Sequence, residues 1–189
     1  MNTNKKNATI VGILILVAYS MLASTATDTK WIATLFDIVS GLAVIGIAVL
    51  MFPLFKVSNR KLSSGYLYMK IIEGALMITA GILFLSDSFR DSRVWIYNYP
   101  QTYAFIISAF LFYILLLKTK LVPRFISIWG IVACFALLIA NATKSLGINS
   151  PALDALMVLI FTNEIFLAIW LMVKGLNTTP VASGAVKQD

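Results

Sequence analysis

Ionisable side chains inside apolar stretches are the first candidates for chemistry in this sequence. They are Asp37, Lys70, Glu73 and Glu164. A charged side chain in hydrocarbon costs at least about 2.5 to 3.5 kcal/mol, so each of the four needs a partner or a function. Lys70 and Glu73 are three residues apart, a spacing that places both on one helix face and within reach of each other. Two kinds of chemistry follow: mutual neutralisation, or the binding of a proton or cation.

Glu164, beside Asn163, lies near the middle of the last apolar stretch. At about 1.5 Å per helical residue, Glu73 is roughly 10 Å and Glu164 roughly 14 Å from the same membrane face. We therefore predict an intramembrane polar site of Lys70, Glu73, Glu164 and Asn163. One of its carboxylates should hold a proton, because one ammonium cannot neutralise two carboxylates in a low dielectric. The alternative is a set of structural charges that hold helices in register.

The other polar residues are weaker candidates for a functional site. Asp37 lies nearer the opposite face, where we expect it to reach water, Asn141 or Lys144 in a structural role. The chain has no histidine, and its single cysteine, Cys134, lies in an apolar run. The most common zinc ligand and the usual catalytic base are therefore missing. We predict no metal site, no cofactor and no catalytic residue.

Six apolar stretches must position these residues. Sixty per cent of the residues are hydrophobic, 12% are charged and the mean hydropathy is +0.90, whereas a soluble domain carries about 25% charged residues. Each stretch is close to the roughly 20 residues that a membrane-spanning helix needs. The prediction is an all-α, polytopic transmembrane helical bundle within residues 1–175, with spans at about 8–24, 32–54, 66–85, 103–117, 123–141 and 153–173. Residues 86–102 are predicted to form an outer loop, and residues 176–189 a disordered cytoplasmic tail.

The distribution of basic residues predicts the orientation of the spans. The net charge of +7 resides mainly in short connections, which is typical of membrane topology rather than of nucleic-acid binding. Ten Lys and Arg residues fall on one side and four on the other, so both termini are predicted to be cytoplasmic. The ten are Lys5, Lys6, Lys56, Arg60, Lys61, Lys118, Lys120, Arg124, Lys174 and Lys187. An alternative is that residues 1–26 form a cleaved signal peptide.

Three motifs fall in the third, fifth and sixth spans. The first contains Tyr68, Lys70, Glu73 and Gly74, the second runs from Lys118 to Gly130 through Pro123, Arg124 and Trp129, and the third runs from Glu164 to Gly175 through Trp170 and Lys174. Together they resemble domain-of-unknown-function family 4386, whose pattern more often has arginine at the place of Lys70. The resemblance implies a helical bundle in a bacterial membrane and adds Arg124 to Asp37 as a secondary candidate.

Three classes of function follow, all in a multi-pass protein of the bacterial cytoplasmic membrane. We favour a non-catalytic accessory or sensory subunit. The first alternative is a small transporter or proton-linked permease using Lys70, Glu73 and Glu164, since the six spans divide into two halves with a buried carboxylate in the third helix of each. The least favoured is a membrane-embedded lipid-modifying enzyme. The expected partners are the lipid bilayer, another membrane protein or a second copy, and a small molecule or proton, but not nucleic acid.

Overall fold

The computed structural model describes residues 3–27, 29–148 and 150–177, and this part of the chain contains helices and no strands. The elements in chain order are α1 (Thr3–Ala18), α2 (Met21–Thr25), α3 (Lys30–Lys56), α4 (Arg60–Phe84), η1 (Asp87–Phe89), α5 (Arg90–Ile96), η2 (Tyr97–Gln101), α6 (Thr102–Thr119), α7 (Arg124–Ser145) and α8 (Pro151–Val173). Six segments are long and apolar enough to cross a membrane. The predicted all-α bundle with six spans is confirmed.

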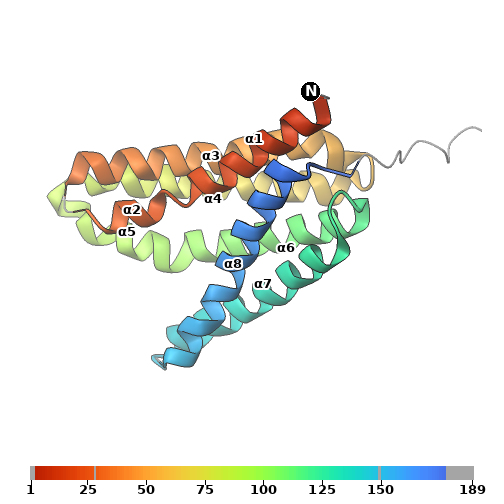
Figure 1. Cartoon of the computed structure of the whole chain (residues 1–189). Helices are drawn as coiled ribbons and strands as arrows, with labels where there is room; N and C mark the ends of the chain where they lie inside the picture. The colour runs from red at the N-terminus through yellow and green to blue at the C-terminus, as the bar shows by residue number, and fades with distance from the viewer. Residues whose placement is uncertain (1–2, 28, 149, 178–189) are drawn as a thin grey trace, which may run out of the picture.

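The six long helices pack as a closed ring (Figure 1). In order around the ring, α1 is followed by α3, α4, α6, α7 and α8, which packs against α1 again. The helices α4 and α8 therefore take opposite places in the ring. This arrangement matters for function because Lys70 and Glu73 belong to α4, while Glu164 belongs to α8.

The first predicted span is broken into two helices. The α-helix ends at Ala18, and a turn through Tyr19 and Ser20 separates it from α2. The hydroxyls of Ser20 and Ser40 are hydrogen bonded at 2.9 Å, so the turn is held against α3. Polar side chains that bond elsewhere compete with regular helix formation. The break brings the side chain of Tyr19 to the inner face of the ring.

The prediction of a loop at residues 86–102 is wrong. This segment is helical throughout most of its length and continues into α6, so the fourth span extends over Asp87–Thr119. Pro100 lies in the π-helical turn η2, where its missing N–H prevents one regular hydrogen bond. The Thr102 hydroxyl donates to the carbonyl of Tyr97 at 2.6 Å. Residues that usually form turns are thus part of a helix here. The hydrogen bond between Thr102 and Tyr97 was not indicated by the sequence pattern.

The ends of several helices follow the expected chemistry. Pro123 immediately precedes α7, Pro151 is the first residue of α8, and Gly175 ends α8 with a φ of +79°. In contrast, α4 begins at Arg60, six residues before the predicted span, because the Asn59 side chain accepts a hydrogen bond from the Leu62 N–H. Glu73 is therefore roughly 20 Å along its helix rather than 10 Å.

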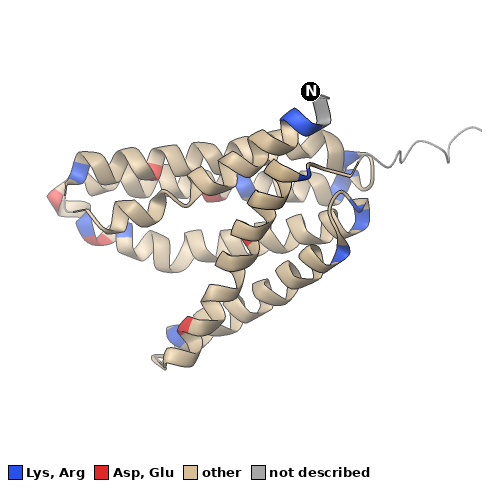
Figure 2. Cartoon of the chain, in the orientation of Figure 1, with Lys and Arg blue, Asp and Glu red and all other residues tan. Residues whose placement is uncertain are grey.

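The start of α1, the end of α8 and most of the described Lys and Arg residues lie at one end of the ring (Figure 2). The turns between α3 and α4 and between α6 and α7, together with the end of α8, lie at this end. Leu176 is buried, and Asn177 bonds the carbonyls of Leu121 and Lys120. These two residues pack against the bundle, although we expected a tail from residue 176. The rest of that predicted tail, residues 178–189, lies outside the described residues.

Candidate functional site

A close crossing of α3 and α4 determines where Lys70 and Glu73 of α4 lie. Gly41 and Gly74 face each other so closely that a Cβ added to either would lie 2.6 Å from the carbonyl oxygen of the other. Small residues at such a crossing allow two helix backbones to approach in a membrane protein. The crossing fixes the rotation of α4 immediately beside Glu73, whose side chain is 1% exposed.

Lys70 and Glu73 form the ion pair that their spacing predicts. The Lys70 Nζ lies 3.0 Å from one Glu73 carboxylate oxygen and 3.3 Å from the other. The Ser108 hydroxyl of α6 donates a third bond to Glu73 at 2.5 Å. Lys70 also lies over the ring of Phe105, with its Nζ 5.3 Å from the centroid. The charge of Glu73 is therefore compensated by groups from two helices.

Glu164 has a different partner. Its carboxylate accepts a hydrogen bond of 2.7 Å from the hydroxyl of Tyr19, at the turn between α1 and α2. The Tyr19 ring in turn packs edge-on against Phe161, with centroids 5.0 Å apart. Unlike Glu73, Glu164 is only partly buried. Its carboxylate is thus oriented by a neutral donor.

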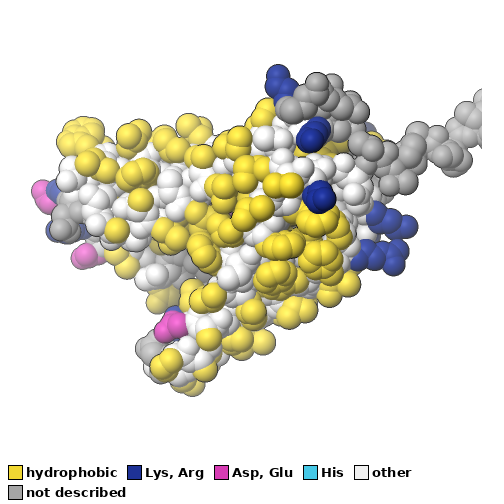
Figure 3. Space-filling view, in the orientation of Figure 1, with side chains coloured by type: hydrophobic (Ala, Val, Ile, Leu, Met, Phe, Trp, Pro, Cys, Tyr) yellow, Lys and Arg dark blue, Asp and Glu magenta, His cyan; other side chains and the backbone are white. Residues whose placement is uncertain are grey.

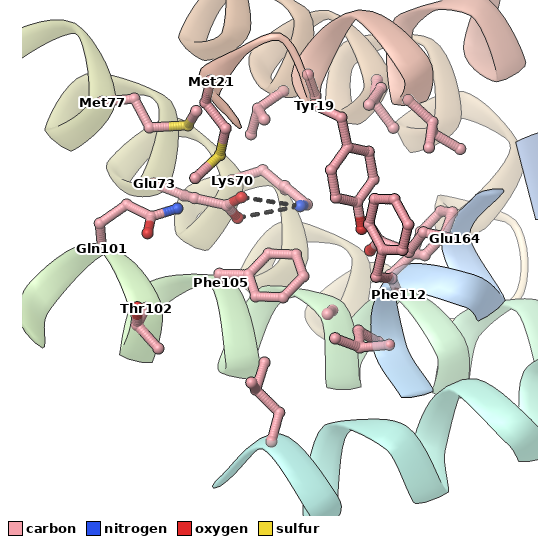
Figure 4. Close-up of a pocket in the computed structure, with 18 of the residues that line it drawn as sticks. Tyr19, Met21, Lys70, Glu73, Met77, Gln101, Thr102, Phe105, Phe112 and Glu164 are labelled. Carbon is pink, nitrogen blue, oxygen red and sulfur yellow. Dashed lines mark hydrogen bonds and ion pairs between the residues drawn. The ribbon is translucent and has the colours of Figure 1, made fainter. Parts of the chain in front are cut away.

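Lys70, Glu73 and Glu164 all line one cavity of about 270 Å³ (Figure 4). Every helix of the ring contributes to its wall, and most of the lining is apolar. In the view of Figure 4, the Lys70 ammonium lies between Glu73 and the Tyr19–Glu164 pair. The structure therefore brings the three predicted charges to one intramembrane space, across which α4 and α8 face each other.

Additional polar residues line the same cavity. Tyr66 is fully buried, and its hydroxyl has no hydrogen-bond partner within the described residues. Gln101 and Thr102 contribute from the start of α6 and the turn before it.

The cavity opens on one side of the ring. Two of its lining residues are well exposed, Leu22 of α2 at 50% and Phe161 of α8 at 39%. The mouth therefore lies between α2 and the first half of α8. Figure 3 shows the surface notched between the end of the molecule that contains α2 and α5 and the arm formed by α7 and α8. Leu22 and Phe161 both belong to segments apolar enough to cross a membrane, so we expect the mouth to face hydrocarbon rather than water.

Two predicted site residues lie elsewhere. Asn163 is buried and donates to the carbonyl of Ile126 at 3.1 Å, so it joins α8 to α7 and does not line the cavity. Including Asn163 in the polar site was wrong, because adjacent helical residues point to different faces. Arg124 is exposed at the start of α7, near the basic end of the ring.

Asp37 belongs to a separate polar cluster at the opposite end. The Arg93 guanidinium lies 2.8 Å from the Asp37 carboxylate, and Ser24 and Tyr97 each donate a hydroxyl to that carboxylate at 2.7 Å. Arg93 also lies over the ring of Phe84. The expectation that Asp37 reaches water, Asn141 or Lys144 was wrong, because its side chain is 0% exposed and its partners come from α2, α5 and η2.

The residues that the sequence did not reveal are those supplied by distant segments. Tyr19 bonds Glu164, Ser108 bonds Glu73 and Arg93 bonds Asp37. None of the three is a near neighbour in sequence of the carboxylate that it contacts. A weak signal exists for two of them. Tyr19 and Ser20 interrupt the first apolar run, and Ser108 is a hydroxyl inside the fourth.

The fold and the cavity define a multi-pass membrane protein with a polar site inside its helical ring. The model of DUF4386, a domain of unknown function, matches residues 18–89 and 84–175, so the chain belongs to this family. The family resemblance seen in the sequence is thereby confirmed. No curated protein and no solved structure matches the chain.

Proposed function

We propose that this chain is a non-catalytic accessory or sensory membrane protein that binds a small amphipathic molecule in its intramembrane cavity. The observation that carries the proposal is the convergence of Lys70, Glu73 and Glu164 on one mainly apolar cavity. Ligand sites are typically concave and apolar, with a few polar groups that fix orientation. We place the protein in the bacterial cytoplasmic membrane, with both termini in the cytoplasm.

The distribution of groups along the cavity supports an amphipathic ligand. Polar side chains occupy the middle of the cavity, while Met21, Met77 and Met157 lie among the apolar residues of its wall. Methionine side chains are flexible and adapt to varied apolar shapes. An apolar body would contact these residues, and one polar group would reach Glu164 or Lys70. Occupancy would then be transmitted to another membrane protein or a second copy through the helices that contact the ligand.

A catalytic role receives less support from the same contacts. Among the described charged groups that line the cavity, Glu73 is the one with a serine partner, since the Ser108 hydroxyl donates to its carboxylate. Ser108 is fully buried and does not line the cavity, so a ligand there would not reach its oxygen. A nucleophile needs both an adjacent base and contact with the substrate.

Proton-linked transport is the second candidate, and the contact between Glu164 and Tyr19 favours it. Tyr19 lies at the break between α1 and α2, so a change in the protonation of Glu164 would alter a bond at the junction of these two helices. In proteoliposomes with a proton gradient, transport of a bound ligand by wild type and its loss in Glu164→Gln would support this candidate. Equal flux in both proteins would oppose it.

Ligand-dependent stabilisation tests the main proposal. The full chain in detergent is melted in the presence of cationic, neutral and anionic amphiphiles of small size. A ligand at one hundred times its Kd should stabilise the folded protein by about 2.7 kcal/mol. We expect at least one class to raise the melting temperature of wild type.

A matched pair of variants locates the binding. Leu22→Trp should narrow the mouth of the cavity and reduce the stabilisation by ligand. Leu16→Trp introduces the same side chain at an exposed position of α1 that does not line the cavity, and it should behave like wild type. Unchanged stabilisation of Leu22→Trp, or no stabilisation of wild type by any of the three classes, would contradict the proposal.

A further inference from the structure

The charges that line the cavity do not balance. Among the described lining residues there are two carboxylates, Glu73 and Glu164, and one cation, Lys70. Lys70 is committed to Glu73, which it contacts through both carboxylate oxygens. The closest polar partner of Glu164 is the uncharged hydroxyl of Tyr19. One carboxylate in a low-dielectric space therefore has no cation of its own, and a charge left in that state is strongly unfavourable.

The walls around Glu164 are suited to a positive charge. Tyr19, Tyr66, Phe105, Phe112 and Phe161 all line the cavity. Aromatic faces attract cations, and the effect grows when water is excluded. The protein already uses one of these rings in this way, since Lys70 lies over Phe105. Tyr66 stacks on Phe112 with centroids 5.5 Å apart and adds a buried hydroxyl oxygen that has no partner among the described residues.

The position of the mouth determines how a ligand would arrive. Leu22 and Phe161 mark an opening between α2 and α8. Both lie in segments apolar enough to cross a membrane, so we expect this opening to face hydrocarbon. A strongly hydrated cation, such as a metal ion, would have to shed its water before it reached this opening. A cation with an apolar body can instead partition into the bilayer and enter sideways.

We propose that the ligand of this cavity is a lipophilic organic cation, of the alkylammonium or arylammonium class, whose charge pairs with Glu164. This inference rests on the proposed ligand-binding function and gives that function a ligand class. The competing possibility for balancing the charge is a proton on Glu164, and in that case the cavity would prefer a neutral ligand. The two possibilities differ in the effect of ligand charge at constant ligand shape.

Three probes of similar shape make this comparison. Benzyltrimethylammonium is cationic, neopentylbenzene replaces its nitrogen by carbon, and phenylmethanesulfonate is anionic. Binding to the full chain in detergent is measured by calorimetric titration and by the ligand-induced rise in melting temperature. We expect the cation to bind at least about tenfold more tightly than the neutral isostere, as close charge pairs at desolvated sites do.

Two variants assign the effect to Glu164. Glu164→Gln keeps an oxygen for Tyr19 and should lower the affinity for the cation at least about tenfold, with little change for the neutral probe. Asp154→Asn makes the same change of charge on the same helix, at an exposed residue that pairs with Lys144 outside the cavity. It should leave the affinity of all three probes unchanged.

The outcomes separate the inference from the function on which it rests. Equal or tighter binding of the neutral or anionic probe to wild type overturns the cation assignment and leaves the ligand-binding function standing. This comparison needs no variant, so a folding defect in Glu164→Gln does not affect it. Full retention of cation affinity in Glu164→Gln also overturns the assignment. If none of the three probes binds wild type, the cation assignment and the proposed function both fail.

Discussion

Each of the three carboxylates inside the helical ring is held by groups of a different kind. Glu73 has a lysine and a serine, Glu164 has a tyrosine, and Asp37 has an arginine with two hydroxyls. The Asp37 cluster is closed, because its carboxylate is fully buried and bonded to side chains of α2, α5 and η2. These contacts hold the three short elements to α3. The more open environment of Glu164 is the reason to assign ligand binding there and a structural role to Asp37.

Removing the cation of the Asp37 cluster should be more damaging than removing both charges. Arg93→Met leaves a buried carboxylate without its charged partner, which is expected to cost about 3 to 5 kcal/mol. The double variant Asp37→Asn with Arg93→Met should recover part of that loss, since no charge is then stranded. Thermal unfolding in detergent measures both effects.

The neighbouring Arg90 provides the control for this comparison. Arg90 begins α5 and is exposed, so Arg90→Met should melt within a degree or two of wild type, as exposed substitutions usually do. If Arg93→Met melted at the same temperature as Arg90→Met, the Asp37 carboxylate would have to be satisfied by Ser24 and Tyr97 alone.

Local pairs were predictable from the sequence, and distant ones were not. Lys70 and Glu73 share a helix face by spacing alone, so their ion pair follows from helix geometry. The Arg93 partner of Asp37 comes from 56 positions along the chain, and the Tyr19 partner of Glu164 from 145. Such contacts depend on which helices become neighbours in the ring. The cost of burying each charge showed that a partner was needed but did not identify it.

At the scale of helices, composition predicted the long apolar spans correctly but did not predict the helices formed by their polar ends. The apolar runs are long enough to predict six spans, and six are present. Residues 86–102 carry charges and a proline, which are typical of a loop. In the structure they fold as helix, with Arg93 paired to Asp37 and the Thr102 hydroxyl bonded to the Tyr97 carbonyl across the π-helical turn. Tertiary contacts overrode the local preference.

The crossing of α3 and α4 depends on the absence of side chains at two glycines. In Gly74→Ala, the new Cβ would lie 2.6 Å from both the Gly41 carbonyl oxygen and the Ile45 Cγ1 atom. Because a backbone atom cannot move aside locally, the helices must separate, and overpacking of this kind costs about 1 to 3 kcal/mol. We expect a lower melting temperature and weaker ligand binding, since Glu73 would shift with α4.

Gly65 is the matched control on the same helix. A Cβ at Gly65 meets only the Leu111 Cδ1 atom, at an ordinary 3.8 Å. Gly65→Ala should therefore be neutral or stabilise α4 by up to about 1 kcal/mol through helix propensity. A Gly74→Ala variant that melts as high as Gly65→Ala would show that the crossing can widen at no cost.

For the whole molecule, the ring determines which chain segments share a side of the membrane. Lys5 lies close to Gly175, so the start of α1 and the end of α8 lie on the same side of the bundle. The turns around Ser58 and around Lys120 lie at the same end, whereas the turn around Leu146 lies at the other. The described residues among the ten basic residues counted in the sequence are thereby concentrated at one end, which we expect from the positive-inside rule to be cytoplasmic.

Cysteine labelling tests this orientation. Cys134 is buried and is the single cysteine of the chain, so Cys134→Ser provides a background without a thiol. In that background, Ser58→Cys and Leu146→Cys each place one thiol in an exposed turn, at opposite ends of the ring. A membrane-impermeant maleimide applied to intact cells should label Leu146→Cys and should label Ser58→Cys only after the membrane is permeabilised. Labelling of Ser58→Cys in intact cells, with protection of Leu146→Cys, would show that the topology is the reverse of the predicted one. The mouth of the cavity would then open toward the cytoplasmic leaflet.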